Sequence, residues 1–195
     1  LARVAVALNK ASQSKLPPLV LMTDDERLPD PLTAAKALPR GSMVVVRARQ
    51  SSLRAKLARS LQQISRARSL VLLIANDPEL ADRLGVQGLH LSESNGRQAC
   101  EWRARRPHWV ITAAAHSFAG GARARRHGAD VIFLSSVFAT ASHQGQQQLG
   151  AARARMMARQ LPLPVYVLGG MDWQSATLLK GAPFAGIAAI GALAF

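Results

Sequence analysis

Short apolar segments rich in β-branched residues recur along nearly the whole chain, and stretches with helical spacing separate them. Most of these segments are almost continuously apolar, which is typical of parallel strands buried on both faces. Polar residues gather at their carboxyl ends, as Thr23 and Asp24 do at the first. The pattern predicts an α/β fold, a single-domain (β/α)8 TIM barrel, whose active site is built at the carboxyl ends of the strands. The eight segments are 19–24, 43–48, 71–77, 88–93, 110–117, 130–138, 164–170 and 186–193.

The stretches between the apolar segments have the 3.6-residue spacing of amphipathic helices. Ser51 and Ser52 are candidate caps at the start of one such stretch, and Gly128 is a candidate cap at the end of another. Asp172 is a plausible cap for the last helix, which should run to about residue 180. The expected helices are 51–68, 78–84, 117–127 and 172–180.

The length of 195 residues suits one compact barrel domain, which we expect at 19–195 behind a helical N-terminal extension at 1–18. No apolar run approaches the ~20 residues that span a bilayer, so no membrane association is expected. A single cysteine, Cys100, excludes an internal disulfide and fits a reducing compartment, which predicts a cytoplasmic protein. The sequence leaves a homodimer open.

The chain is strongly basic, with 25 Lys and Arg against 11 acidic residues and a formal net charge of +14. Such a surface attracts phosphate regardless of nucleotide sequence. The arginines are nevertheless scattered through helical stretches, and aromatic residues make up only 5% of the chain, so there is little to stack on bases. The sequence therefore argues against nucleic-acid binding, while the positive field favours small anionic substrates.

Two clusters of polar residues follow the second and third apolar segments. Arg47 and Arg49 stand at alternate positions, so in a strand both guanidinium groups would face the same side. Two such groups suit a phosphate or pyrophosphate, and the alternative is a solvated strand end. Asn76 and Asp77 offer an amide beside a carboxylate, which suits Mg²⁺. Asp77 precedes Pro78 and equally suits the N-cap of a helix.

Glycines and histidines mark the remaining strand ends. Gly169 and Gly170 follow the seventh segment, and loops after the last two strands of such barrels often bind phosphate through backbone N–H groups. Histidine can relay protons near neutral pH. His116 and His143 are candidates, and His90 is interpreted as structural. The polar stretch 139–148 is long for a connection between a strand and a helix; it could cover the site or be a surface loop.

These pieces, in this order and spacing, resemble the thiamine phosphate synthase superfamily, which includes a thiazole tautomerase branch. The resemblance runs from about residue 19 to residue 195. It is carried by VLMTDDERL, VVRAR, LLIANDPELADRLGVQGLHLSES, AAAHSFAGGARARRHGADVIFLSSVFATASH, VYVLGGM and GIAAIGAL.

The resemblance implies that an aminopyrimidine methyl pyrophosphate loses pyrophosphate and that the ring nitrogen of a thiazole phosphate captures the resulting carbocation. Carried over by position, Arg47 and Arg49 bind the pyrophosphate, Asn76 contacts it and Asp77 binds Mg²⁺. Catalytic roles thus fall to the two arginines and to His116. The residues implied to hold the substrates further along the chain are Thr140, His143, Gly169, Gly170, Ile190 and Gly191.

Three positions depart from the family pattern. The second Mg²⁺ aspartate falls at Asn95, which leaves Glu93 as the candidate replacement. The serine of the fifth strand is Ala114, and the lysine of the loop after the sixth strand is His143. Because these changes weaken pyrophosphate handling, two alternatives stay open. One is a thiazole tautomerase in which His116 moves the ring proton, and the other is a non-catalytic phosphate-binding or regulatory relative.

Overall fold

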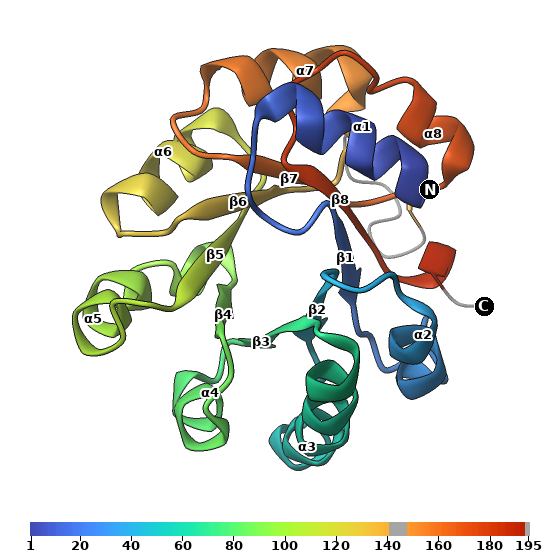
Figure 1. The fold of residues 1–195 in the computed structure, drawn as a ribbon. Helices are drawn as coiled ribbons and strands as arrows, with labels where there is room; N and C mark the ends of the chain where they lie inside the picture. Colours follow the sequence, from blue (N-terminus) through green and yellow to red (C-terminus); the bar gives the residue numbers. More distant parts are fainter. Residues whose placement is uncertain (141–147, 194–195) are drawn as a thin grey trace.

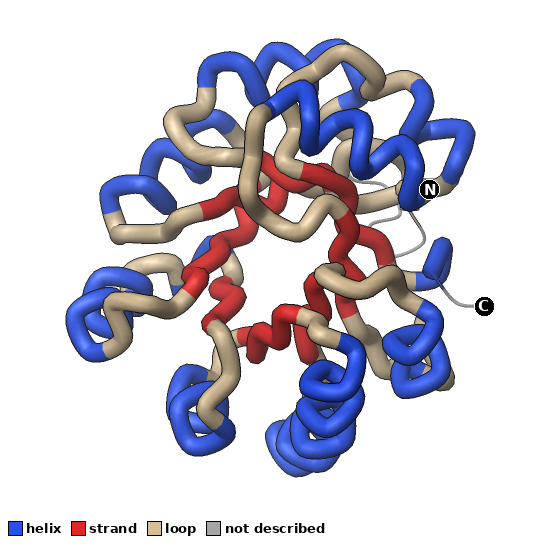
Figure 2. The backbone as a smooth tube through the Cα atoms, in the orientation of Figure 1, coloured by secondary structure: helices blue, strands red, loops and turns tan. Residues whose placement is uncertain are grey.

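A computed structural model describes residues 1–140 and 148–193, and this part of the chain forms a closed barrel of parallel strands in the order β1-β2-β3-β4-β5-β6-β7-β8. The ring of strands lies inside and the helices lie outside it (Figure 1, Figure 2). The predicted (β/α)8 barrel is confirmed. The strands are β1 (Leu19–Met22), β2 (Met43–Val46), β3 (Val71–Ala75), β4 (Gly88–Leu91), β5 (Val110–Ala115), β6 (Val131–Leu134), β7 (Val165–Val167) and β8 (Gly186–Ala189).

Each predicted segment contains one strand, but every strand ends two to four residues before its segment does. The apolar residues at the start of each segment pair with both neighbouring strands, as Leu21 does with Val44 and Ala189. The polar residues at its end leave this hydrogen-bonded ladder and enter the loops at the rim. The candidate site residues therefore lie in these loops.

The helices alternate with the strands as the pattern predicts, and those expected at 51–68 and 78–84 have these bounds. Residues 141–147 lie outside the described part of the chain. The helical elements are α1 (Ala2–Ser12), α2 (Pro31–Ala37), α3 (Ser51–Arg68), α4 (Pro78–Leu84), η1 (Glu93–Asn95), α5 (Gln98–Arg105), α6 (Phe118–Arg126), α7 (Gly150–Gln160), α8 (Trp173–Thr177) and η3 (Gly191–Leu193).

Helix ends differ from the expectation at three places. Gln50 precedes α3 and makes no side-chain capping bond, so the predicted serine cap is wrong. The C-cap of α6 is His127, and Gly128 follows it with a φ of 89°. Asp172 caps α8 as expected, but the helix ends at Thr177 because the next residues form single turns with i→i+3 bonds.

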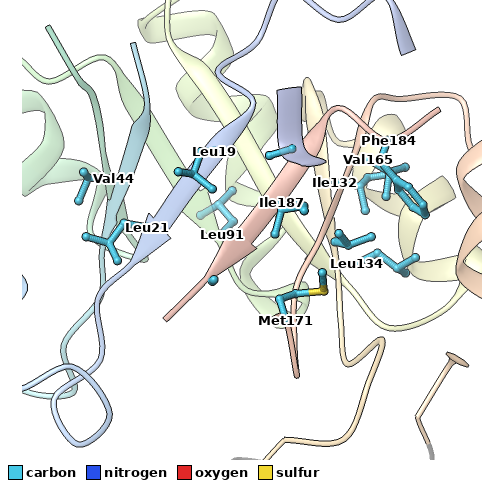
Figure 3. Close-up of a cluster of buried hydrophobic side chains, with 14 of the residues drawn as sticks. Leu19, Leu21, Val44, Leu91, Ile132, Leu134, Val165, Met171, Phe184 and Ile187 are labelled. Atoms are coloured by element: carbon cyan, nitrogen blue, oxygen red, sulfur yellow. The ribbon is translucent and has the colours of Figure 1, made fainter. Parts of the chain in front are cut away.

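The core has two layers because alternate residues of a strand point to opposite sides of the sheet. Inside the barrel, Met43, Phe133 and Tyr166 are among the fully buried side chains. Outside it, residues such as Leu21 and Ile187 pack beneath the helices (Figure 3). Burial on both faces explains why the strand segments are continuously apolar.

Helix α1 packs against β1, β8 and α8 at the wall where the barrel closes. Ala5 and Leu8 are buried there, and the Asn9 amide donates to the carbonyls of Leu16 (2.9 Å) and Ala185 (2.6 Å). Together these contacts tie the N-terminal segment to the β8 end of the sheet. Within residues 1–140 and 148–193, no helix has both the length and the apolar character needed to cross a membrane.

Strand pairing in the barrel leaves no room for a side chain at Gly88. A Cβ atom there would lie 2.0 Å from the carbonyl oxygen of Val110 on β5. We predict that Gly88→Ala lowers the free energy of unfolding by on the order of 3 kcal/mol, because backbone must move to relieve the clash. Gly96→Ala is the control, since its Cβ would meet nothing closer than 3.4 Å. Urea unfolding measures both; equal stability of the two variants would contradict the strand register.

Candidate active site

A cavity of about 900 Å³ opens at the carboxyl ends of the strands. Residues following all eight strands line it, as the barrel geometry requires. Ten of the predicted site residues are among them: Arg47, Arg49, Asn76, Glu93, His116, Thr140, Gly169, Gly170, Ile190 and Gly191. Asp77 and Asn95 do not line it, and His143 lies outside the described residues.

The two predicted pyrophosphate ligands are paired with acids of the loop between β1 and α2. Arg47 Nη1 donates to Asp24 Oδ2 at 2.9 Å, and Arg49 Nη1 lies 2.7 Å from Glu26 Oε1. The backbone N–H of Arg49 also donates to Asp25 Oδ2 at 2.8 Å. Both arginines line the cavity with these acidic partners beside them.

Asp24, one of the polar residues at the end of the first apolar segment, lines the cavity, although no specific role was predicted for it. It accepts hydrogen bonds from Arg27 at 2.8 and 3.1 Å and from Arg47. The bonds from the Arg27 guanidinium hold the pKa of the Asp24 carboxyl far below its ordinary range. Asp24 therefore stays ionised and orients both guanidinium groups.

Asn76 and Asp77, which were predicted to act together, make contacts in different places. Asn76 has a φ of 52°, lines the cavity, and its Oδ1 accepts from Ser92 N (2.8 Å) and Asn95 Nδ2 (3.2 Å). Asp77 instead caps α4 through Leu80 N (3.1 Å) and pairs with Arg54 (3.1 Å). Its carboxylate is thus used in the helix cap, which was the other interpretation of this motif.

Glu93 and His116 form a pair at the ends of β4 and β5. Glu93 Oε2 accepts from the backbone N (3.0 Å) and from Nδ1 (2.7 Å) of His116. Its Oε1 accepts from Arg123 Nη2 on α6. Burial alone would raise the pKa of Glu93, but the hydrogen bonds from His116 and the charges of His116 and Arg123 lower it overall.

His90 is a buried side chain at the floor of the cavity. Its Nδ1 shares a hydrogen bond with Thr112 Oγ1 at 2.8 Å, and its ring packs edge-on against Phe133 with centroids 4.8 Å apart. Burial, with a smaller contribution from the charge of Arg47, lowers the pKa of His90 from 6.5 to about 4. It is therefore neutral at pH 7, in keeping with the structural role expected for it.

The Gly169–Gly170 turn has positive φ angles of 95° and 62°, which glycine adopts without strain. A Cβ at Gly170 would lie 2.2 Å from the carbonyl oxygen of Ala139, so this turn packs directly on the loop after β6. Among the described residues, the N–H groups of Gly169 and Gly170 donate to no acceptor. Two unpaired donors at the cavity wall suit a phosphate oxygen.

The sequence profile of thiamine monophosphate synthase matches residues 19–193, which is almost the whole chain. This protein belongs to the thiamine monophosphate synthase family. The resemblance found from the motifs is confirmed.

Two relatives are similar to this chain over most of their own length. "Putative thiamine-phosphate synthase 2" of Aquifex aeolicus is 29% identical over 82% of this chain and 88% of its own. The thiamine-phosphate synthase of Chlorobium luteolum is 26% identical over 91% of this chain and 85% of its own. A solved thiamine phosphate pyrophosphorylase from Pyrococcus furiosus has a TM-score of 0.73 at 21% identity, covering 94% of this chain and 87% of that one, and supports the fold alone.

The family resemblance implies Mg²⁺, but the three predicted ligands do not fit one site in the described structure. Asp77 is engaged by Arg54 and the start of α4, and Glu93 by His116 and Arg123. Asn95 is neutral and donates to Asn76. No group of three or more His, Cys, Asp and Glu side chains within 1–140 and 148–193 could hold a metal ion. Mg²⁺ binding by these residues stays a prediction.

The neutral state of His90 makes the stability of the fold depend on pH. Because the folded-state pKa is lowered from 6.5 to about 4, the unfolded chain binds more protons between these values. The free energy of unfolding therefore has its full value above pH 6.5 and falls as the pH drops toward 4. We predict that wild type loses up to about 3 kcal/mol more than His90→Gln between pH 7 and 4.5. Urea unfolding at both pH values measures it; equal losses would contradict the buried, neutral state of His90.

Proposed function

We propose that this protein is a thiamine phosphate synthase, which joins an aminopyrimidine methyl pyrophosphate to a thiazole phosphate and releases thiamine phosphate and pyrophosphate. Membership of the family across the whole barrel carries the proposal. The cavity supports it, because arginines and free N–H donors stand on separate parts of one rim. A cytoplasmic location, favoured by the single Cys100, is part of the same proposal.

The chemistry that the family resemblance implies has two steps. The bond between the pyrimidine methylene carbon and the pyrophosphate oxygen breaks, and both of its electrons leave with the pyrophosphate. The thiazole ring nitrogen then donates its lone pair to the methylene cation. Negative charge grows on the departing pyrophosphate, so fixed cations beside it lower the barrier.

We assign the leaving-group side to Arg47 and Arg49. Their carboxylate partners, Asp24 and Glu26, keep them at the rim before substrate binds. Pyrophosphate offers more oxygens and more charge than one carboxylate, so bidentate bonds to it can replace these ion pairs. Asp77, Glu93 and Asn95 each have other partners, so the two arginines are the groups that we assign to the departing pyrophosphate.

We assign the thiazole phosphate to the turn of Gly169 and Gly170 and to the neighbouring backbone at Ile190 and Gly191. The two free N–H groups of the turn supply donors without adding a side chain. Thr140 lines the same cavity from the loop after β6. This arrangement would place the thiazole ring toward the arginine side of the cavity.

A thiazole tautomerase is the second candidate, favoured by His116 at the cavity with a carboxylate on its Nδ1. A histidine held in this way can take a proton from one ring atom and return it to another. NMR of the thiazole carboxylate phosphate tests this: tautomer conversion that needs His116, with no thiamine phosphate formed, would favour the tautomerase over the synthase.

Substitution of one arginine tests the synthase directly. We predict that Arg47→Ala lowers kcat/KM for thiamine phosphate formation about 10- to 100-fold, because one charged hydrogen-bonding group to pyrophosphate is lost. Arg40→Ala is the matched control: it removes the same charge from a side chain that bonds Ser69 before β2 begins. Product is measured by chromatography, and a full rate in Arg47→Ala would contradict the assignment.

The glycine turn gives an independent test of the thiazole side. We predict that Gly170→Ala raises the KM for thiazole phosphate at least about tenfold, because the clash with Ala139 displaces the N–H donors. Gly181→Ala is the control, since it has a similar φ of 77° but open space around its Cβ. If both variants keep the wild-type KM in steady-state assays, the phosphate does not bind at this turn.

A further inference from the structure

We propose that Glu93 is a positioning residue for His116 rather than a metal ligand, and that Gly120 provides the space in which it does so. The inference rests on the proposed function, because it concerns the same cavity. It gives a role to the carboxylate of Glu93, which the family resemblance made a candidate Mg²⁺ ligand.

Glu93 holds His116 at two points with one oxygen. Oε2 accepts from the backbone N–H at 3.0 Å and from the ring Nδ1 at 2.7 Å. The first bond fixes the chain where β5 ends, and the second fixes the rotation of the imidazole ring. A histidine so held has little freedom to turn away from the cavity that it lines.

The carboxylate also decides which ring nitrogen carries the proton. A carboxylate only accepts, so Nδ1 must be the donor, and neutral His116 is then the Nδ1–H tautomer with a lone pair on Nε2. Nε2 has no hydrogen-bond partner within residues 1–140 and 148–193. It is therefore the ring nitrogen that can exchange a proton with a bound substrate.

The second oxygen of Glu93 is held by a different residue. Oε1 accepts from Arg123 on α6, and Glu93 also lines a separate cavity of about 490 Å³ between η1 and α6. Both oxygens are thus committed to His116 and Arg123. The nearby Asn95 faces Asn76 instead, so the two residues do not form a common metal site.

Gly120 is what allows the carboxylate to lie there. It stands in the first turn of α6, where its N–H donates to the Ser117 cap at 3.0 Å. A Cβ at this position would lie 2.5 Å from Oε1 and 2.9 Å from Cδ of Glu93. These atoms are the end of a flexible side chain, so alanine would push Glu93 aside while leaving the backbone in place. Alanine is also the better helix former, so the variant should fold.

The test is the ¹⁵N spectrum of the free protein at pH 9, above the ordinary histidine pKa of ~6.5. Protonated and unprotonated ring nitrogens have well-separated shifts, and a His116→Gln spectrum assigns the signal. We expect the Nδ1–H tautomer in wild type and in Glu93→Gln, whose amide oxygen still accepts. We expect a shift toward Nε2–H, the form preferred by free histidine, in Glu93→Ala and Gly120→Ala. Gly96→Ala is the control and should match wild type.

The rate of thiamine phosphate formation gives a second readout. Glu93→Ala and Gly120→Ala should lower its kcat about tenfold, because both release His116, to which the family resemblance assigns a catalytic role. The Mg²⁺ concentration for half-maximal rate should stay unchanged. An Nε2–H wild type, an unchanged spectrum in Gly120→Ala, or a tenfold higher Mg²⁺ requirement in Glu93→Ala would overturn the proposal. Absence of turnover in wild type would contradict the proposed function instead, and the spectra would still decide the role of Glu93.

Discussion

Closure of the sheet between β1 and β8 is the constraint on which the rest of the structure depends. The pairing of Leu19 with Ile187 completes the ring and leaves none of the strands β1 to β8 with an unpaired edge. It also brings the carboxyl ends of all the strands to one rim. Asp24, His116 and Gly170, which are far apart in the sequence, therefore line a single cavity. Buried apolar side chains on both faces of the sheet hold this rim in place.

The net charge of +14 does not by itself describe the rim, because acidic side chains there are paired with the arginines. The loop after β1 supplies Asp24, Asp25 and Glu26, which together engage the cavity arginines. A ligand must therefore compete with carboxylates that are already in place, which favours the multiple oxygens of phosphate groups over a single carboxylate. A ligand of Glu93 would likewise have to compete with His116 and Arg123, which occupy its two oxygens.

The fold could be predicted almost completely from the sequence, because buried parallel strands have a distinctive apolar pattern. Strand starts agree within one residue, whereas strand ends depend on neighbouring strands that no local window contains. The strand-end rule also placed Arg47 and Gly169 at the cavity. The rule does not hold for Asp77. The positive φ of Asn76 turns the chain at this point, and Asp77 then caps α4. The rule could not pair Glu93 with His116 either, since 23 residues separate them in the chain and only the pairing of β4 with β5 brings them together.

A crystal structure with thiamine phosphate and pyrophosphate would show whether the two ends of the cavity bind the two phosphate groups. We expect pyrophosphate on the guanidinium groups of Arg47 and Arg49, which have left Asp24 and Glu26. We expect the phosphate of thiamine phosphate on the N–H donors of Gly169 and Gly170. Ligands bound outside the cavity at the strand ends, or bound there with both arginine pairs still intact, would contradict this assignment.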